Sequence, residues 1–177
     1  MFTMGPFFKT KIRDIALPVA SCLDKLQQYS FQSAPVSLQL SSSAFPVGGL
    51  LPSLYRYSGY NCNPPLQISG LPTATRSMSV ILEQRDAPVA ARTHWVCWDL
   101  PPATDIATRE TRGTHGRNDF LHHGYTGPYT QDSLCRYYIV VYALRSRLHL
   151  PCGASRHQAE RLLASQLLAC GELGFFA

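Results

Sequence analysis

The sequence predicts an all-β domain, an antiparallel sandwich or barrel, with one helix near its C-terminus. Several segments are rich in β-branched and aromatic residues, which favour strands. The segments between them are rich in Gly, Pro, Asn and Ser, which favour turns and loops. A helical pattern follows only after the last of these strands. Strands joined by such loops, without intervening helices, are typical of antiparallel packing.

Four strands are predicted in chain order. "VSLQL" (36–40) alternates apolar and polar residues, as a half-buried strand does. "SMSVILEQ" (77–84) begins with the same alternation and then becomes continuously apolar. "HWVCWDL" (94–100) and "YYIVVYAL" (137–144) are aromatic and β-branched, and so indicate strands with at least one buried face.

The C-terminal helix is predicted within "GASRHQAERLLASQLLACG" (153–171). Ser155 with Gln158 three residues later matches a capping box, and Gly171 can close the helix in a left-handed conformation. The residues with helical spacing are Ala159, Leu162, Leu163, Gln166 and Leu167. Residues 1–34 are predicted to be an N-terminal extension with one short helix in "SCLDKLQQYS", and residues 35–177 to be the folded domain.

Composition excludes several classes of protein. The chain has 177 residues, 45% hydrophobic and 15% charged, which suits a globular domain with a full core. It has no apolar stretch long enough to cross a bilayer. The net charge is +5, but the 16 Lys and Arg residues are scattered, so we expect no nucleic-acid partner. A small anionic ligand needs only one or two local donors.

The six cysteines lack CxxC or zinc-finger spacing, so we expect free, buried thiols and no metal site. "VASC", ending at Cys22, faintly resembles a bacterial lipobox, which keeps export as a lipoprotein open as an alternative. Asp14 in the flank and Pro18 in the apolar run argue against a signal peptide. The expected location is therefore the cytoplasm.

Several motifs occur together in order. "NCNPPL" (61–66) resembles a family motif Asn-x-Ser-Pro-x-Leu, and "QRDAP" (84–88) stands where that family has Asp-Pro-Asp-Ala-Pro. "HWVCWDLP" (94–101) resembles His-Trp-x-x-x-Asn-Ile-Pro, followed by "GRNDF" and "GYTGP". "LCRYYIVVYAL" (134–144) stands in place of x-His-Arg-Tyr and a strand ending Tyr-Ala-Leu. The chain thus resembles the phosphatidylethanolamine-binding protein family, in its bacterial Raf-kinase-inhibitor-like branch.

This resemblance implies a two-sheet antiparallel Greek-key β-sandwich with a small anion pocket at one end. The family's pocket histidine falls on His94, which would donate an N–H to a bound oxyanion, and its pocket tyrosine falls on Tyr137. The turn formed by Gly127, Pro128 and Tyr129 would form the rim, where backbone groups can approach a ligand. The expected ligand is phosphate, phosphoethanolamine or a similar anion, with no cofactor.

Two positions depart from the family pattern. Gln84 replaces the first aspartate, so the pocket loses a carboxylate that could bind an ammonium group. Asp86 keeps the second acid, with an expected structural role of bonding loop amides or Arg136. Cys135 replaces the second histidine, and two interpretations stay open: an inert filler, or a thiol–imidazole pair with His94.

The expected function is therefore a non-enzymatic anion-binding or regulatory module. Two alternatives stay open: a degenerate scaffold that acts through protein partners, and thiol chemistry at Cys135. The scaffold could be a homodimer that uses apolar residues of the extension such as Phe2, Phe7 and Phe8.

Overall fold

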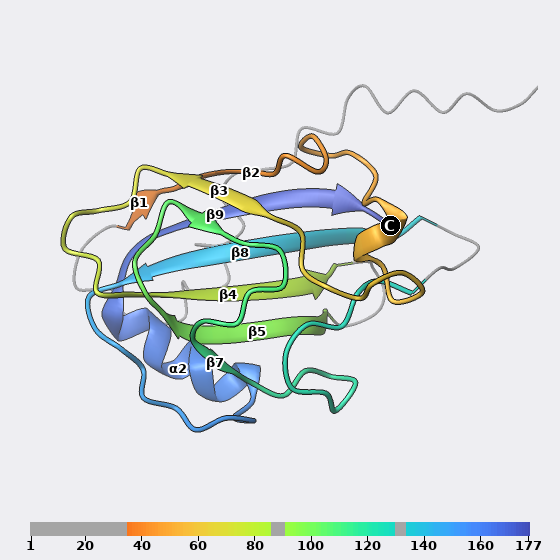
Figure 1. Ribbon diagram of the computed structural model, residues 1–177. Helices are drawn as coiled ribbons and strands as arrows, with labels where there is room; N and C mark the ends of the chain where they lie inside the picture. Colours follow the sequence, from red (N-terminus) through yellow and green to blue (C-terminus); the bar gives the residue numbers. More distant parts are fainter. Residues whose placement is uncertain (1–34, 86–90, 130–133) are drawn as a thin grey trace, which may run out of the picture.

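Two β-sheets and one α-helix form the part of the chain described by the computed structural model, residues 35–85, 91–129 and 134–177 (Figure 1). The larger sheet has the strand order β1-β9-β8-β4-β5-β7, and the smaller has the order β2-β3-β6. The predicted 21–30 helix, Asp86 and the apolar residues of the extension lie outside the described residues.

The strands of the larger sheet are β1 (Val36–Ser37), β4 (Ser77–Gln84), β5 (Arg92–Leu100), β7 (Thr114–His115), β8 (Arg136–Leu144) and β9 (Leu167–Phe176). The smaller sheet contains β2 (Gln39–Ser41), β3 (Leu66–Ser69) and β6 (Asp105–Ile106). A short 3₁₀ helix, η1, spans Ser53–Tyr55, and α2 spans Arg156–Gln166. The predicted strands at 77–84, 94–100 and 137–144 are confirmed as β4, β5 and β8.

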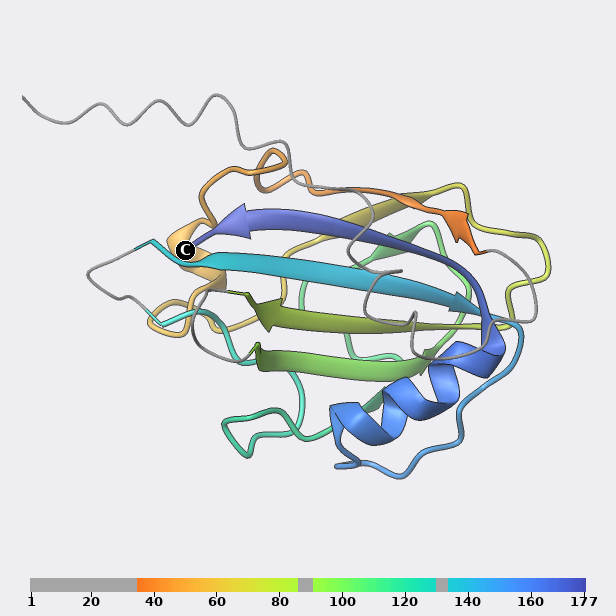
Figure 2. The same ribbon diagram turned by 180° about the vertical axis from the view of Figure 1, so that it is seen from behind.

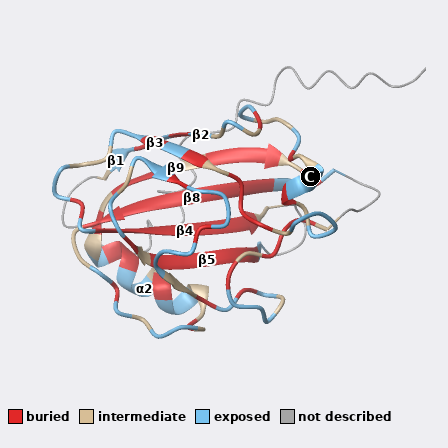
Figure 3. Ribbon diagram, in the orientation of Figure 1, coloured by how far each residue is buried: buried red, intermediate tan, exposed pale blue. Residues whose placement is uncertain are grey.

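The larger sheet lies between two apolar layers. On one face, the smaller sheet packs over it, with Leu40 and Ile68 in the same core cluster as Val80 and Ile139. On the other face, α2 packs through Ala159 and Leu163, as the view from behind shows (Figure 2). Nearly every residue of β4, β5 and β8 is consequently buried (Figure 3). The predicted two-sheet sandwich with a C-terminal helix is confirmed.

The predicted C-terminal boundary of the helix is wrong. The capping box of Ser155 and Gln158 is present as expected, but α2 ends at Gln166 and the chain continues directly into β9. Gly171 lies within β9, where a Cβ atom would stand 2.4 Å from the Leu38 carbonyl oxygen. Close packing of β9 against Leu38, the residue between β1 and β2, therefore explains this glycine.

Among the named strands of the described residues, one pair is parallel. β1 pairs with β9 in parallel, with Val36 opposite Ala169, whereas the long pairs β4–β5, β4–β8 and β8–β9 are all antiparallel. The predicted strand at 36–40 is also divided, because β1 joins the larger sheet and β2 joins the smaller one. Among the described residues, no helix has the length and apolar character needed to cross a membrane.

Candidate functional site

His94 lies at an irregularity in the pairing of β4 with β5. Leu82 pairs with Trp95 and Glu83 pairs with Thr93, so His94 is an additional residue on β5. In such a bulge, two successive side chains turn toward the same face of the sheet. Trp95 lies in the core between the sheets, and the His94 ring contacts Tyr137 of that same core. The bulge thereby directs the imidazole toward the end of the inter-sheet core.

Thr126 holds His94 at two points. The Thr126 N–H donates to the His94 carbonyl at 2.9 Å, and the His94 Nδ1 lies 2.8 Å from the Thr126 carbonyl oxygen. A carbonyl oxygen can only accept, so Nδ1 carries the proton in this hydrogen bond. The neutral ring then presents Nε2 as an acceptor.

Asn118 fixes the loop that carries Thr126. Its Nδ2 donates to the His94 carbonyl at 3.1 Å and to the Thr126 hydroxyl at 2.8 Å. Its Oδ1 accepts from the backbone N–H groups of Phe120 and His122, both at 3.0 Å. Asn118 is buried, so these bonds replace those that water would otherwise supply. We did not predict this positioning role, because an Asn in a polar loop is typical of any turn.

Aromatic rings form two walls around the imidazole. The Tyr137 ring meets it edge to face at a centroid distance of 5.2 Å, and the Phe120 ring does so at 4.7 Å. Tyr137 itself stacks on Phe175. Gln84 lies directly opposite Tyr137 in the β4–β8 pairing and is half-buried. The structure therefore brings His94, Tyr137 and Gln84 to the same end of the sheet.

The His94 Nε2 atom is buried and makes no hydrogen bond to any of the described residues. The residue is only 1% exposed, and burial lowers the pKa of His94 to about 4. The Thr126 carbonyl, the Gly127 backbone and Asp119 act to raise this pKa, whereas Arg92 acts to lower it. Burial and the nearby cation together favour a neutral ring with an unsatisfied acceptor.

Cys135 precedes β8 and is buried in the same core cluster as Tyr137. Its backbone exchanges two hydrogen bonds with Ala177, at 2.9 and 3.1 Å. Since Cys135 and Tyr137 lie in the same core cluster, their side chains share one face, as their spacing of two residues predicts. Whether Cys135 is inert or reactive stays a prediction.

The turn at Gly127, Pro128 and Tyr129 packs against the segment that contains η1. The Gly127 N–H donates to Asn61 Oδ1 at 2.7 Å, and the Pro128 carbonyl accepts from the Tyr57 N–H at 3.0 Å. The Tyr129 ring stacks on Tyr57 at 4.2 Å. Gly127 is therefore required because the backbone of Tyr55 and Tyr57 lies close to it, leaving no room for a Cβ atom. A contact between this turn and a ligand stays a prediction.

Other candidate groups lie elsewhere. His122 and His123 are exposed, as expected, and no cluster of ligands suited to a metal ion occurs among the described residues. The described cysteines are all free, and four of them are buried, as expected, whereas Cys152 is exposed.

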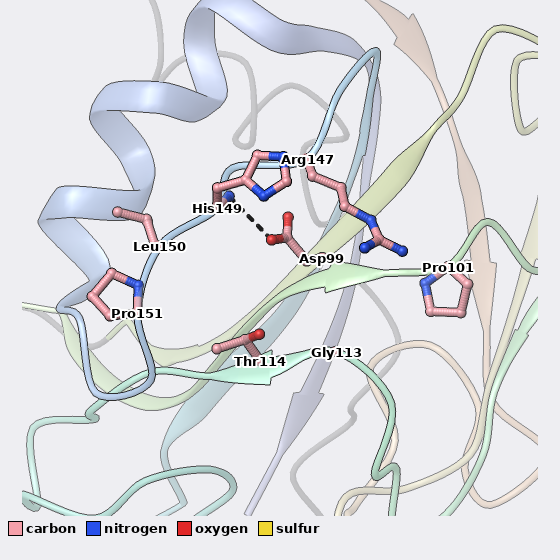
Figure 4. A pocket seen from close by; sticks show the side chains of 8 residues that line it. All are labelled: Asp99, Pro101, Gly113, Thr114, Arg147, His149, Leu150 and Pro151. Atoms are coloured by element: carbon pink, nitrogen blue, oxygen red, sulfur yellow. Dashed lines mark hydrogen bonds between the residues drawn. The ribbon is translucent and has the colours of Figure 1, made fainter.

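Two surface cavities, of about 640 and 590 Å³, do not include His94 in their linings. Figure 4 shows the larger one, where Asp99 accepts from the backbone N–H of His149 at 3.1 Å. That contact ties the loop before α2 to β5, so Asp99 has a structural role here.

Comparison with known proteins identifies the family. The profile of the phosphatidylethanolamine-binding protein family matches residues 41–176. The chain belongs to this family. A UPF0098 protein of Pyrococcus horikoshii is 35% identical over 143 residues, covering 75% of this chain and 72% of that protein. A UPF0098 protein of Aquifex aeolicus is 32% identical over 149 residues, covering 78% of this chain and 87% of that protein.

Solved structures show the same phosphatidylethanolamine-binding protein fold. A homologue from Chlamydia trachomatis has a TM-score of 0.74 at 28% identity, covering 80% of this chain and 97% of that one. YbcL of Escherichia coli, described as a member of the mammalian family, has a TM-score of 0.71 at 24% identity. The match covers 80% of this chain and 98% of that one. The predicted family is confirmed, and the bacterial and archaeal origin of these relatives agrees with the predicted branch.

Proposed function

We propose that this protein is a non-enzymatic binding module that holds a small phosphoryl-type anion at His94 and Tyr137. The observation that carries the proposal is the buried His94 Nε2 without a hydrogen-bond partner among the described residues. A buried polar atom without a partner is rare in native proteins and is explained when a ligand or water supplies the missing bond.

The surroundings of His94 suit an anion. The positive charge of Arg92 acts on the imidazole, and its guanidinium lies over the Phe120 ring at 5.6 Å. Gln84 stands where the family pattern has a carboxylate, so this position does not repel an anion. The same replacement disfavours recognition of the ammonium group of phosphoethanolamine, because an amide carries no charge.

The hydrogen bonding of His94 favours binding over catalysis. In hydrolytic triads, the histidine donates Nδ1–H to a carboxylate, which stabilises the imidazolium that forms during proton transfer. Here Nδ1 donates to the neutral Thr126 carbonyl, and the pKa of His94 is lowered to about 4. A ring that resists protonation is a weak general base near neutral pH.

Titration of the full-length protein with inorganic phosphate and phosphoethanolamine, followed by calorimetry and by NMR of the His94 ring, tests the proposal. We expect binding at millimolar concentrations or below, with inorganic phosphate binding at least as well as phosphoethanolamine. His94→Ala should abolish it, whereas Cys152→Ser, at an exposed position, should not change it. Failure of every anion to bind, or unchanged binding by His94→Ala, would contradict the proposal.

A further inference from the structure

We infer that the anion bound at His94 must carry its own O–H group, which it donates to Nε2. The site would thus take an oxyanion that retains a proton, such as inorganic phosphate or a singly ionised phosphomonoester. It would discriminate against oxyanions of the same shape that have no proton to donate. This inference rests on the proposed function, because it concerns the ligand of the same site.

The hydrogen bond at Nδ1 fixes where the single proton of the neutral ring lies. Nδ1 lies 2.8 Å from the Thr126 carbonyl oxygen, which has no proton to offer. A neutral imidazole has only one N–H, so Nε2 holds a lone pair and cannot donate to an anion. The family resemblance led us to expect His94 as the donor, and this geometry reverses that role for the neutral ring.

The ring has little opportunity to gain another proton. His94 is 1% exposed and contacts the Tyr137 and Phe120 rings, neither of which supplies a charge. Among the charged side chains of the described residues, Arg92 disfavours the imidazolium and Asp119 favours it. The Asp119 carboxylate is already engaged, because its Oδ2 accepts from the Thr93 N–H at 2.7 Å.

Three other titratable groups among the described residues of the surrounding elements have partners of their own. Glu83, the neighbour of Gln84 on β4, pairs with Arg85 and Arg156 on the α2 side of the sheet. His122 bonds the Thr126 hydroxyl at 3.2 Å, and Tyr129 stacks on Tyr57. The imidazole therefore stays an acceptor across the physiological range.

The proton that Nε2 lacks must come from the ligand. Inorganic phosphate at neutral pH carries two negative charges at most and retains one P–OH, which can donate to Nε2. Sulfate has nearly the same size and charge but no proton, so one of its oxygens would face the lone pair of Nε2. An unpaired buried acceptor facing an anion costs at least about as much as a lost hydrogen bond. A phosphomonoester loses its last P–OH above a pKa of about 6.

Competition between phosphate and sulfate at slightly alkaline pH tests the inference with the full-length protein. We expect phosphate to bind at least about tenfold more tightly than sulfate, the factor of one hydrogen bond. His94→Gln supplies an amide that can donate as well as accept, so the preference should fall to about threefold or less. The affinity for phosphoethanolamine should rise as the pH falls through about 6, while that for inorganic phosphate changes less.

The outcomes separate the two proposals. If phosphate and sulfate bind equally well to the wild type, the anion site stands and the inference about the proton is wrong. If neither anion binds, the proposed function fails and the inference fails with it. Nitrogen-15 NMR of the wild-type ring adds an independent readout, because a proton found on Nε2 rather than Nδ1 would overturn the inference even if phosphate binds.

Discussion

Thr126 holds His94 by both its backbone and its ring. The Thr126 N–H donates to the His94 carbonyl, and the Thr126 carbonyl accepts from Nδ1. One residue of a loop thereby sets both the position of the strand end and the tautomer of the imidazole. Because Thr126 is fully buried, water cannot compete for either hydrogen bond.

The neutral ring of His94 predicts a dependence of stability on pH. Its pKa is lowered from the ordinary value of 6.5 to about 4, so the unfolded chain binds the proton more readily. Stability from this residue is fully present above pH 6.5 and is lost as the pH falls toward 4. The loss should amount to about 3 kcal/mol at most, measured by urea unfolding across this range.

His94→Asn provides the matched control for this pH dependence. Its amide N–H can replace Nδ1–H toward the Thr126 carbonyl, but it does not titrate. The variant should be less stable than the wild type at neutral pH, and the difference should shrink as the pH falls to 4. Parallel pH curves for the two proteins would show that His94 is not the group responsible.

Asn118→Asp should destabilise the domain by at least about 2 kcal/mol near neutral pH. The new carboxylate keeps the acceptor for the backbone N–H groups of Phe120 and His122. It loses the Nδ2 donor, which faces the carbonyl oxygens of His94 and Gly124. The same substitution at an exposed loop residue would change stability little.

Acid should partly rescue the Asn118→Asp variant. Burial among oxygen atoms raises the pKa of the introduced carboxyl, so stability lost at high pH returns as the pH falls and the group gains an O–H. The deficit relative to wild type, measured by denaturant unfolding, should therefore be smaller at about pH 4 than at about pH 7. A deficit independent of pH would argue against the role of Nδ2 as the essential donor.

Gly127→Ala should cost about 2 kcal/mol of stability, because the added Cβ would lie 2.6 Å from the Tyr55 carbonyl oxygen and 2.7 Å from the Tyr57 nitrogen. Thermal unfolding measures the loss. Gly70→Ala is the control, since its nearest neighbour is 3.5 Å away and only the positive φ of +80° opposes the substitution. It should cost about 1 kcal/mol. A smaller loss for Gly127→Ala would show that the contact with the η1 segment yields easily.

Regular strands with clear composition were predictable, whereas β9 was not. The segments of β4, β5 and β8 combine β-branched and aromatic residues with turn signals at both ends. In β9, Leu167 continues the spacing of α2, and Gly171 resembles a helix terminator. Pairing with β8 and the close approach of Leu38 decide its conformation, and these are tertiary contacts that local sequence does not record.

The site was predictable in its residues but not in its hydrogen bonding. Family motifs placed His94, Tyr137 and Gln84 together, and the structure brings them to one end of the sheet. The bulge at His94 and the bond to Thr126 depend on how β5 pairs with β4 and with a loop. The bond to Thr126 decides whether Nε2 of His94 donates or accepts a hydrogen bond. The identity of the residue alone does not decide this.

Alkylation by iodoacetamide should separate the cysteines by exposure. Cys152 is exposed, with its sulfur 3.6 Å from His123 Nδ1, whereas Cys135 is buried at 9% exposure. Cys97 is fully buried, and burial raises the pKa of its thiol to about 12. Because the thiolate is the nucleophile, Cys152 should react first in the native protein. Cys135 and Cys97 should react only after the fold opens, with rates that rise in denaturant.

Mass spectrometry of each peptide across a pH series checks this order, and Cys152→Ser should remove the fast reaction while Cys135→Ser leaves it intact. Slow labelling of Cys135 supports its role as an inert filler in place of a histidine. Rapid labelling of native Cys135, with an apparent pKa well below about 8.5, would instead establish a reactive thiol directly before β8. A protonated His94 would favour such a thiolate, so this outcome would support the thiol–imidazole interpretation.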